Sequence, residues 1–241
     1  MAEGSRRDGV RSSLVWDVLR AVASERAEVT GRTVLDIVDV GGGTGGLAVP
    51  FAALGHDVTV IDPSPDALAA AQRRASEAGA RLTAIQGEAA SLDSVAGVAA
   101  ADLVICHNVL EYVEEPAAAM SAIARVLRPS ATVSVLAANA FAAVLHRALA
   151  GRFAEARTLL SSPRLGPAPR RFTLPELTGL ITEAGLRVGE AHGLRIFGGL
   201  VPGALLDGDA AATALRALEE AAAGTPPLRD IAAQLHVLGH R

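Results

Sequence analysis

The stretch DVGGGTGG, Asp39–Gly46, closes the β-branched run TVLDIVDV and opens the apolar segment GGLAVPFAALG at residues 45–55. A β-branched run predicts a strand, and an apolar run that ends at a glycine predicts a helix. A strand, a glycine-rich turn and a helix in this order form the first half of a βαβ unit, with free backbone N–H groups at the turn. The stretch therefore predicts a parallel α/β fold that holds a ligand at the glycine turn.

Strand and helix patterns keep alternating beyond the glycine turn. They amount to βα units joined by short connections, which indicates a parallel sheet covered by helices on both faces. Doubly wound sheets of this kind bind ligands at the carboxyl ends of their strands. We expect further strands at 57–62, at 81–86, up to about His107 and after 128–130, with helices at 64–78, after Ser91 and from about Pro116.

A leading helix and a C-terminal half flank these units. Apolar residues at helical spacing predict the leading helix from Arg11 to about Glu28. Past Asn139 we expect a helical stretch to about Leu160, a loop rich in Pro and Arg, a helix that ends at Gly185, a Gly-rich loop, an Ala-rich helix and a last strand near Ile231–Leu238. We expect one domain over 1–241, with a leading helix (11–30), a cofactor-binding half (31–138) and a substrate-side half (139–241).

The composition excludes several classes of protein. The chain has 241 residues, half of them hydrophobic, and a net charge of −4, which gives no overall attraction to nucleic acid or to an acidic membrane surface. A single cysteine, Cys106, excludes an internal disulfide and a Cys-based zinc cluster, so we expect a reducing cytoplasm and no metal. The N-terminal Arg pair has no apolar segment behind it, and we expect neither export nor a membrane span.

The glycines alone fit two cofactor patterns. Gly41, Gly43 and Gly46 give G-x-G-x-x-G, the dinucleotide fingerprint. Asp39 with Gly41, Gly43 and Gly45 gives D-x-G-x-G-x-G, the usual S-adenosylmethionine loop. Asp62 agrees with both patterns, because an acid at this distance can bind ribose hydroxyls in either case. The glycine spacing therefore leaves both cofactors open.

Features outside the glycines favour S-adenosylmethionine. The Asp39 carboxylate would repel a pyrophosphate and attract the ammonium of a methionine moiety. The LRPS sequence at 127–130 resembles the L-[KR]-P-G turn of class I methyltransferases, and the chain after the fifth strand does not read as a second nucleotide-binding half. The buried-strand residue Asp36 needs a partner, and we expect a salt bridge there.

Over nearly its full length the chain resembles the class I S-adenosylmethionine-dependent methyltransferases. The resemblance implies an α/β fold with a doubly wound, seven-stranded Rossmann-like sheet and an antiparallel C-terminal strand. It also implies that Asp39 contacts the methionine end of the cofactor, that Asp62 binds both ribose hydroxyls and that Glu88 meets the adenine. Gly41, Gly42 and Gly43 let the backbone approach the cofactor, and we interpret Gly46 as close packing at the start of a helix.

The residues past the fourth strand indicate the acceptor, because they face the transferred methyl group in this class. CHNVLEYVEEP at 106–116 has no N-P-P-Y motif, and one cysteine cannot supply paired thiols, so we expect an oxygen nucleophile. The sequence resembles the tRNA 5-carboxymethoxyuridine methyltransferases in Arg11 with Trp16, HNVLEYV at 107–113, Asn139-Ala140 and GLRIF at 193–197. That resemblance implies cofactor contacts at Arg11, Gly41, Gly42, Asp62, Glu88, Ala89 and His107.

A carboxylate acceptor needs a cation to hold it and no strong base, because it is already a nucleophile at neutral pH. Arg195 and Arg171 are the candidates for that clamp, since a guanidinium grips a carboxylate with two hydrogen bonds. His107 is a candidate for the cofactor contact, and it would act as a base only for a phenol or an alcohol.

Residues 141–200 hold eight arginines against four acids and form the one basic region of the sequence, where a tRNA stem could dock. Solvated helix faces explain the same charge count, and the loop PRLGPAPRR at 163–171 lacks the lysines and aromatic residues that the tRNA enzymes carry there. The alternatives are therefore a small-molecule O-methyltransferase, with His107 as base, and a cofactor-binding protein without catalysis.

Overall fold

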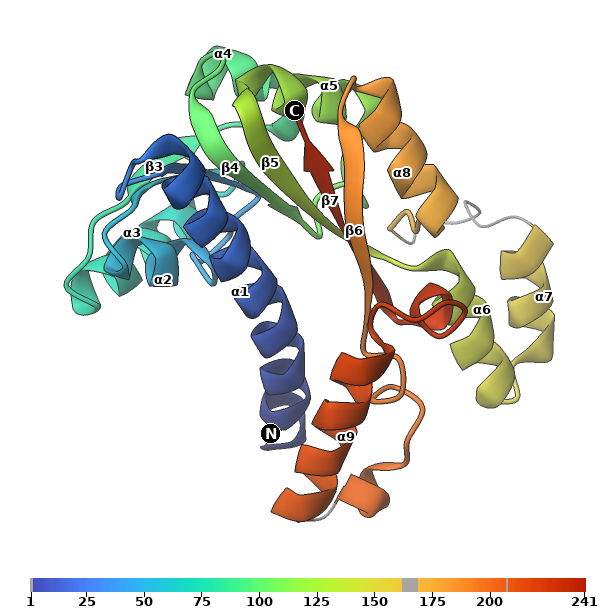
Figure 1. Ribbon diagram of the computed structural model, residues 1–241. Coiled ribbons are helices and arrows are strands. Elements are labelled where there is room, and N and C mark those ends of the chain that lie inside the picture. Colours follow the sequence, from blue (N-terminus) through green and yellow to red (C-terminus); the bar gives the residue numbers. More distant parts are fainter. Residues whose placement is uncertain (1, 162–168, 207) are drawn as a thin grey trace. The chain divides into compact units, whose positions relative to one another are not determined.

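A computed structural model describes residues 2–161, 169–206 and 208–241, with side chains described from Leu14 onward except that of Ala204 (Figure 1). These residues form a seven-stranded sheet in the order β3-β2-β1-β4-β5-β7-β6. The strands are β1 (Asp36–Val40), β2 (Asp57–Asp62), β3 (Thr83–Gln86), β4 (Ala101–His107), β5 (Leu127–Ala138), β6 (Arg187–Leu194) and β7 (Gln234–His240).

The first four strands are parallel, and the C-terminal strand runs against its neighbours. β1 pairs in parallel with β2 and with β4, and β2 pairs in parallel with β3. At one end of β5, Ser130 N–H donates to Arg241 O over 3.0 Å, and at its other end Asn139 N–H donates to Ala233 O over 3.1 Å. β7 is therefore antiparallel to β5. The predicted fold, a seven-stranded Rossmann-like sheet with an antiparallel C-terminal strand, is confirmed.

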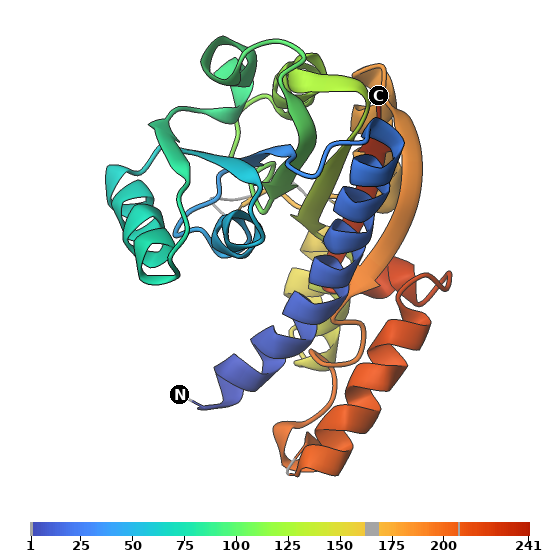
Figure 2. The ribbon, with the colours of Figure 1, turned by 60° about the vertical axis from the view of Figure 1, so that its left-hand side comes forward.

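The helices follow the predicted order, with differences at their ends. The described helices are α1 (Ala2–Thr30), α2 (Ala48–Ala53), α3 (Pro65–Glu77), α4 (Leu92–Ala96), α5 (Pro116–Val126), α6 (Ala140–Leu149), α7 (Phe153–Ser161), α8 (Leu174–Glu183) and α9 (Asp209–Ala222), with 3-10 turns η1 (Ala89–Ser91), η2 (Gly203–Leu206) and η3 (Arg229–Ile231). α2 and α3 lie next to each other (Figures 1 and 2). The leading helix begins nine residues before the predicted Arg11, at Ala2.

The helical stretch predicted from 140 to about 160 is two helices, α6 and α7. Between them Gly151 adopts a φ of +72°, a left-handed conformation that ends a helix and that glycine reaches without strain. The first strand is also shorter than predicted, because it begins at Asp36 and not at Thr33. LRPS, predicted as a turn before the fifth strand, forms the first residues of β5, with Ser130 at a φ of +60°.

The chain divides into two compact units. The glycine-loop unit comprises Leu19–Val135, Thr178–Glu190 and Leu238–Arg241, and the α9 unit comprises the residues up to Val18, Leu136–Leu177 and Ala191–Val237. In the glycine-loop unit β4 is buried along almost its whole length, as expected for a strand covered on both faces. Cys106 on β4 is fully buried, and burial raises the pKa of its thiol.

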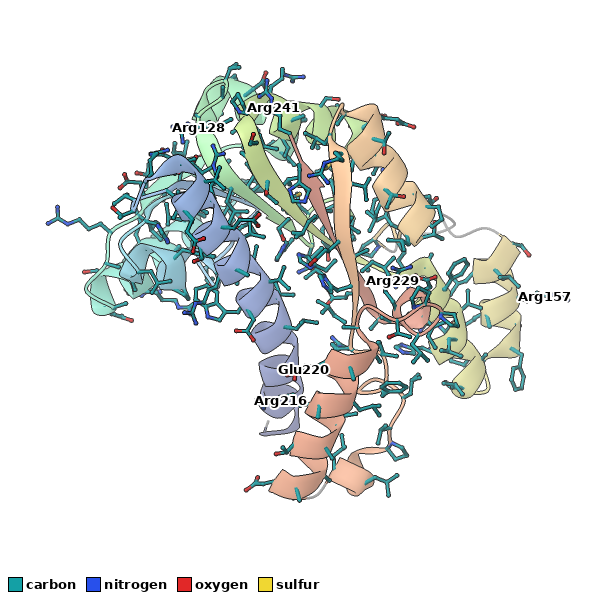
Figure 3. The ribbon with its side chains drawn as sticks, in the orientation of Figure 1. Arg128, Arg157, Arg216, Glu220, Arg229 and Arg241 are labelled. Carbon is teal, nitrogen blue, oxygen red and sulfur yellow. The ribbon has the colours of Figure 1, made fainter. Side chains whose placement is uncertain are left out.

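A cluster of ionic side chains lies at the amino ends of β1 and β4, away from the glycine turn. Asp102 is fully buried and accepts hydrogen bonds from Arg26, Arg32 and Arg128. Arg128, labelled in Figure 3, also pairs with Asp36 over 2.7 Å. The salt bridge predicted for Asp36 is thus confirmed, with Arg32 as a second partner at 2.8 Å. Since these ions lie at the opposite strand ends from the ligand turn, the cluster is structural.

Within the described residues, no helix combines the length and the apolar character that a membrane crossing requires.

Candidate active site

The glycine turn after β1 is built around two positions that no side chain could occupy. Gly41 adopts a φ of +64°, and a Cβ there would collide with the side chain of Val109, which follows β4. A Cβ on Gly42 would lie 2.7 Å from the carboxylate carbon of Asp39 and 3.0 Å from Val60. These glycines therefore let the turn pack against the end of β4 and over the Asp39 carboxylate.

The interpretation of Gly46 as a closely packed glycine is wrong. A Cβ on Gly46 would meet no atom within 4 Å. The close contact lies one residue earlier, since a Cβ on Gly45 would approach Val49 to 2.9 Å and Ala71 to 3.2 Å. Gly45 belongs to the D-x-G-x-G-x-G pattern, and Gly46, which completes the dinucleotide pattern, has no packing role here.

Asp62 is fixed at the carboxyl end of β2. Its side chain is 8% exposed. One carboxylate oxygen accepts from Gly43 N–H over 2.9 Å, and the other accepts from Ser64 N–H over 2.9 Å. Each oxygen has a further lone pair, so the carboxylate can still accept from a pair of hydroxyls. The glycine turn and the start of α3 thus fix Asp62 in place and leave it able to accept further hydrogen bonds.

Asp39 is buried beneath the same turn, at 4% exposure. Burial, together with the nearby negative charge of Asp62, raises its pKa to about 7, while an N–H donated by Ala48 opposes that shift. Two carboxylates in so little water favour a cation between or beside them. The ionised Asp39 carboxylate therefore destabilises the ligand-free turn, and a positively charged ligand nearby would stabilise it.

A pocket of about 700 Å³ opens beside these groups, within the range of small-molecule sites. It contains four of the predicted site residues, namely Gly41, Asp62, Glu88 and Ala89. Its described lining also includes Asn108, Val109, Tyr112, Glu114 and Glu115 and no basic side chain. An acidic lining suits a sulfonium or ammonium cation and disfavours a pyrophosphate.

Sequence reasoning did not single out Asn108, Tyr112 or Glu114. They belong to the loop after β4, where Asn108 has a φ of +56° and Tyr112 N–H donates to Val109 O over 2.9 Å. Tyr112 is 73% exposed at the pocket, unusual for an aromatic side chain. The available signal was the position itself, because loops at the carboxyl ends of parallel strands carry ligand contacts.

His107 ends β4 and is outside the residues that line the pocket. Its Nε2 lies 2.7 Å from Oγ of Ser134, a fully buried residue of the neighbouring β5. This contact ties the imidazole ring to β5. Arg11, the remaining predicted cofactor contact, belongs to residues 2–13, and its side chain lies outside the described residues.

Arg195 belongs to the α9 unit, where it follows β6 and is half-buried. It has a φ of +59°, a left-handed conformation that costs a residue with a side chain about 1–2 kcal/mol. Burial of the His146 imidazole on α6, and to a smaller extent the positive charges of Arg195 and Arg147, lower the pKa of His146. Strain of this kind in a loop is common where a side chain must be aimed for function.

Asn139, part of the predicted family pattern, has a structural role. Its amide nitrogen donates to Asp230 O over 2.8 Å and to Ala232 O over 2.7 Å. Its amide oxygen accepts from Phe141 N–H over 3.0 Å and so caps the start of α6. In the basic region, Glu155 pairs with both Arg147 and Arg152, which reduces the charge available to an outside partner.

Known proteins resemble this chain in sequence and in fold. Residues 38–135 match a family described as "Methyltransferase domain". The chain is 28% identical over 209 residues to tRNA 5-carboxymethoxyuridine methyltransferase of Escherichia coli (strain K12), over 80% of this chain and 74% of that protein. It is 31% identical over 174 residues to ubiquinone biosynthesis O-methyltransferase of Xanthomonas axonopodis pv. citri (strain 306), over 71% of this chain and 69% of that protein.

Solved structures agree on the fold. A SAM-dependent methyltransferase from Methanosarcina mazei superposes with a TM-score of 0.59 at 17% identity, over 87% of this chain and 93% of that one. The acidic pocket, the Asp39 turn and the sheet order all fit S-adenosylmethionine and its sulfonium charge. The chain belongs to the class I S-adenosylmethionine-dependent methyltransferases.

Proposed function

We propose that the enzyme methylates a carboxylate oxygen of a modified tRNA wobble uridine of the 5-carboxymethoxyuridine type. The observation that carries this proposal is the 28% identity to a tRNA 5-carboxymethoxyuridine methyltransferase over 80% of the chain. The GLRIF sequence at 193–197 supports it, because Arg195 supplies a cation suited to an acidic acceptor.

The residues around the pocket divide the binding of the cofactor among them. Asp39 attracts the cationic methionine end, and Asp62 accepts hydrogen bonds from both ribose hydroxyls. Glu88 and Ala89 line the part of the pocket that takes the adenine. Gly41, Gly42 and Gly43 carry no side chain, so the backbone of the turn can approach the cofactor. S-adenosylmethionine supplies the electrophilic methyl group when it is bound. His107, at the end of β4, is the further cofactor contact that the family resemblance assigns.

On the acceptor side, Arg195 would hold the carboxylate of the substrate through its guanidinium group. The carboxylate is ionised at neutral pH, so no residue has to remove a proton before the transfer. The acidic pocket keeps this anion from occupying the cofactor site. Alignment and exclusion of water then account for the rate, in the way expected of positioned displacement reactions.

A tRNA partner would meet the arginines of the α9 unit. Arg157 on α7 is labelled in Figure 3, and Arg170 and Arg171 follow the segment 162–168. Their phosphate contacts would be salt-dependent and would supply affinity without sequence preference. Arg171, the second candidate for the carboxylate clamp, is half-buried and suits either role.

A small-molecule O-methyltransferase is the second candidate function. The 31% identity to ubiquinone biosynthesis O-methyltransferases supports it. A phenolic acceptor needs a base, and His107 is the candidate in that case. The hydrogen bond between Nε2 and Ser134 Oγ would then orient the ring.

The two functions are separated by one transfer experiment. The enzyme is incubated with S-adenosylmethionine labelled in the methyl group and either total tRNA or a small-molecule extract, both from the native host lacking this gene. The proposal expects label in tRNA, and tRNA from the intact host should accept far less because its sites are already methylated. Label in the extract and none in tRNA overturns the proposal.

A further inference from the structure

The turn that carries Arg195 is held by an acidic side chain far away in the sequence. Three successive backbone N–H groups converge on the Glu219 carboxylate of α9: Ile196 donates over 2.7 Å, Phe197 over 2.9 Å and Gly198 over 2.7 Å. Glu219 is 6% exposed, so these charge-assisted bonds are shielded from water. A carboxylate with three such donors fixes the backbone directly after Arg195.

The residues on either side of Arg195 leave the turn little freedom. Arg195 O accepts from Ala233 N–H over 3.3 Å, and Gly193 N–H donates to Ala223 O over 2.8 Å. A Cβ on Gly193 would lie 2.6 Å from the carbonyl oxygen of Arg229, a residue labelled in Figure 3. Because the backbone is held at Gly193 before Arg195 and at residues 196–198 after it, the surroundings impose the left-handed φ of Arg195.

The same turn also packs against α6. A Cβ on Gly199 would lie 3.2 Å from both Cε1 and Nε2 of His146, so the ring lies over the end of the turn. Burial, with smaller contributions from the charges of Arg195 and Arg147, lowers the pKa of His146. The positive charge of Arg195 suits an anionic group and disfavours a cationic one.

We propose that Glu219 is a positioning residue that acts through Arg195, by locking the 195–198 turn so that the guanidinium is aimed at the acidic acceptor. The proposal rests on the function proposed above. A left-handed arginine strains this turn, because glycine would adopt the same φ without strain, and the three N–H bonds to Glu219 hold the backbone directly after it. The arrangement is explained if the direction of the Arg195 side chain is what matters.

The test is a double-mutant cycle between Glu219→Gln and Arg195→Ala, read out as kcat and KM for tRNA from the host lacking this gene. Glu219→Gln keeps the shape but turns an amide NH₂ toward a donor, which loosens the turn. Glu220→Gln is the matched control, because Glu220 is the next residue of α9 and is exposed (Figure 3). The dissociation constant for S-adenosylmethionine, measured by calorimetry, serves as the check on folding.

We expect Arg195→Ala to raise KM for tRNA by about 100-fold, because it removes the charge-assisted hydrogen bonds to the acceptor. We expect Glu219→Gln to raise KM by about 10-fold or more, because it misplaces the guanidinium without removing it. The double variant should match Arg195→Ala alone, while cofactor binding and the Glu220→Gln variant stay at the wild-type values. If Glu219→Gln binds no cofactor, Glu219→Asp repeats the test with the charge kept and the carboxylate withdrawn by one methylene.

The outcomes separate this proposal from the function beneath it. Effects that add in the double variant, or a Glu219 variant that leaves KM unchanged while Arg195→Ala raises it, overturn the role of Glu219 and leave the proposed function standing. Methylated tRNA with no effect of Arg195→Ala overturns the clamp and the role of Glu219 together. The absence of any tRNA methylation overturns the proposed function itself.

Discussion

Replacing Asp39 by asparagine should stabilise the ligand-free enzyme and weaken its cofactor binding at the same time. Burial and the charge of Asp62 raise the pKa of Asp39 from an ordinary 3.8 to about 7. Because the folded state holds this proton more tightly than the unfolded state, the contribution of Asp39 to stability is full below about pH 3.8 and is lost as the pH rises through 7. An asparagine side chain has no charge to bury and keeps an oxygen for Ala48 N–H.

The size of the effect follows from the shift. A pKa that moves from 3.8 to about 7 corresponds to about 4 kcal/mol above pH 7, an upper bound for a buried group. We expect Asp39→Asn to gain about 2–4 kcal/mol in the free energy of unfolding at pH 8, and the gain to shrink by about 2 kcal/mol at pH 5. Urea unfolding of the ligand-free protein at pH 5, 6, 7 and 8 measures both values.

The same variant should bind S-adenosylmethionine at least about tenfold more weakly by calorimetry at pH 8, because the methionine ammonium loses its carboxylate. Asp17→Asn is the matched control: Asp17 is exposed on α1, and its replacement should change stability by less than about 0.5 kcal/mol at every pH. A gain that is independent of pH, or a loss of stability at pH 8, would refute the reasoning about the buried carboxylate pair.

Three further predictions concern other parts of the glycine-loop unit. Asp62→Ala should abolish measurable cofactor binding in calorimetry, because it removes the acceptor aimed at the ribose; binding within threefold of wild type would contradict this assignment. Asp102→Asn should lower the free energy of unfolding by about 3–5 kcal/mol, since it removes the buried anion that three arginines share and leaves Asp36 to pair with Arg32 and Arg128 alone, and a loss below about 1 kcal/mol in urea unfolding would contradict the structural role of the cluster. Ser130→Gly should raise the melting temperature through a gain of about 0.5–1 kcal/mol, because glycine accepts the φ of +60° and keeps the N–H bond to Arg241; a lower melting temperature would show that the position is not strained.

Much of the fold could be predicted because local signals agree with tertiary structure in the parallel half. The second strand lies at 57–62 as predicted, since a β-branched run there ends at an acid and a helix cap follows directly. The break at Gly151 was missed, because an isolated glycine inside an apolar helical pattern is compatible with a continuous helix. The start of the first strand was placed at Thr33, where apolar and β-branched residues continue although the backbone is not yet paired.

The candidate site likewise contains residues that a local motif predicts and residues that only tertiary contacts bring into place. Asp39, Asp62 and the glycines belong to one turn and one strand end, so their spacing along the chain carries the geometry. Tyr112 and Asn108 line the pocket only because β4 lies next to β1, a pairing that no short motif encodes. The three hydrogen bonds to Glu219 span 21 to 23 residues and join a loop to a helix. Neither hydrophobic periodicity nor motif spacing predicts such contacts.

The chemistry of the transferred methyl group is the most direct test of the central claim, which is esterification of a tRNA carboxylate. tRNA from the host lacking this gene is labelled by the enzyme with S-adenosylmethionine, purified and treated with mild alkali. A methyl ester hydrolyses under these conditions, so the account predicts that the label leaves the tRNA as volatile methanol. Label that stays on the nucleoside after alkali, as an ether, N-methyl or C-methyl group would, contradicts the account.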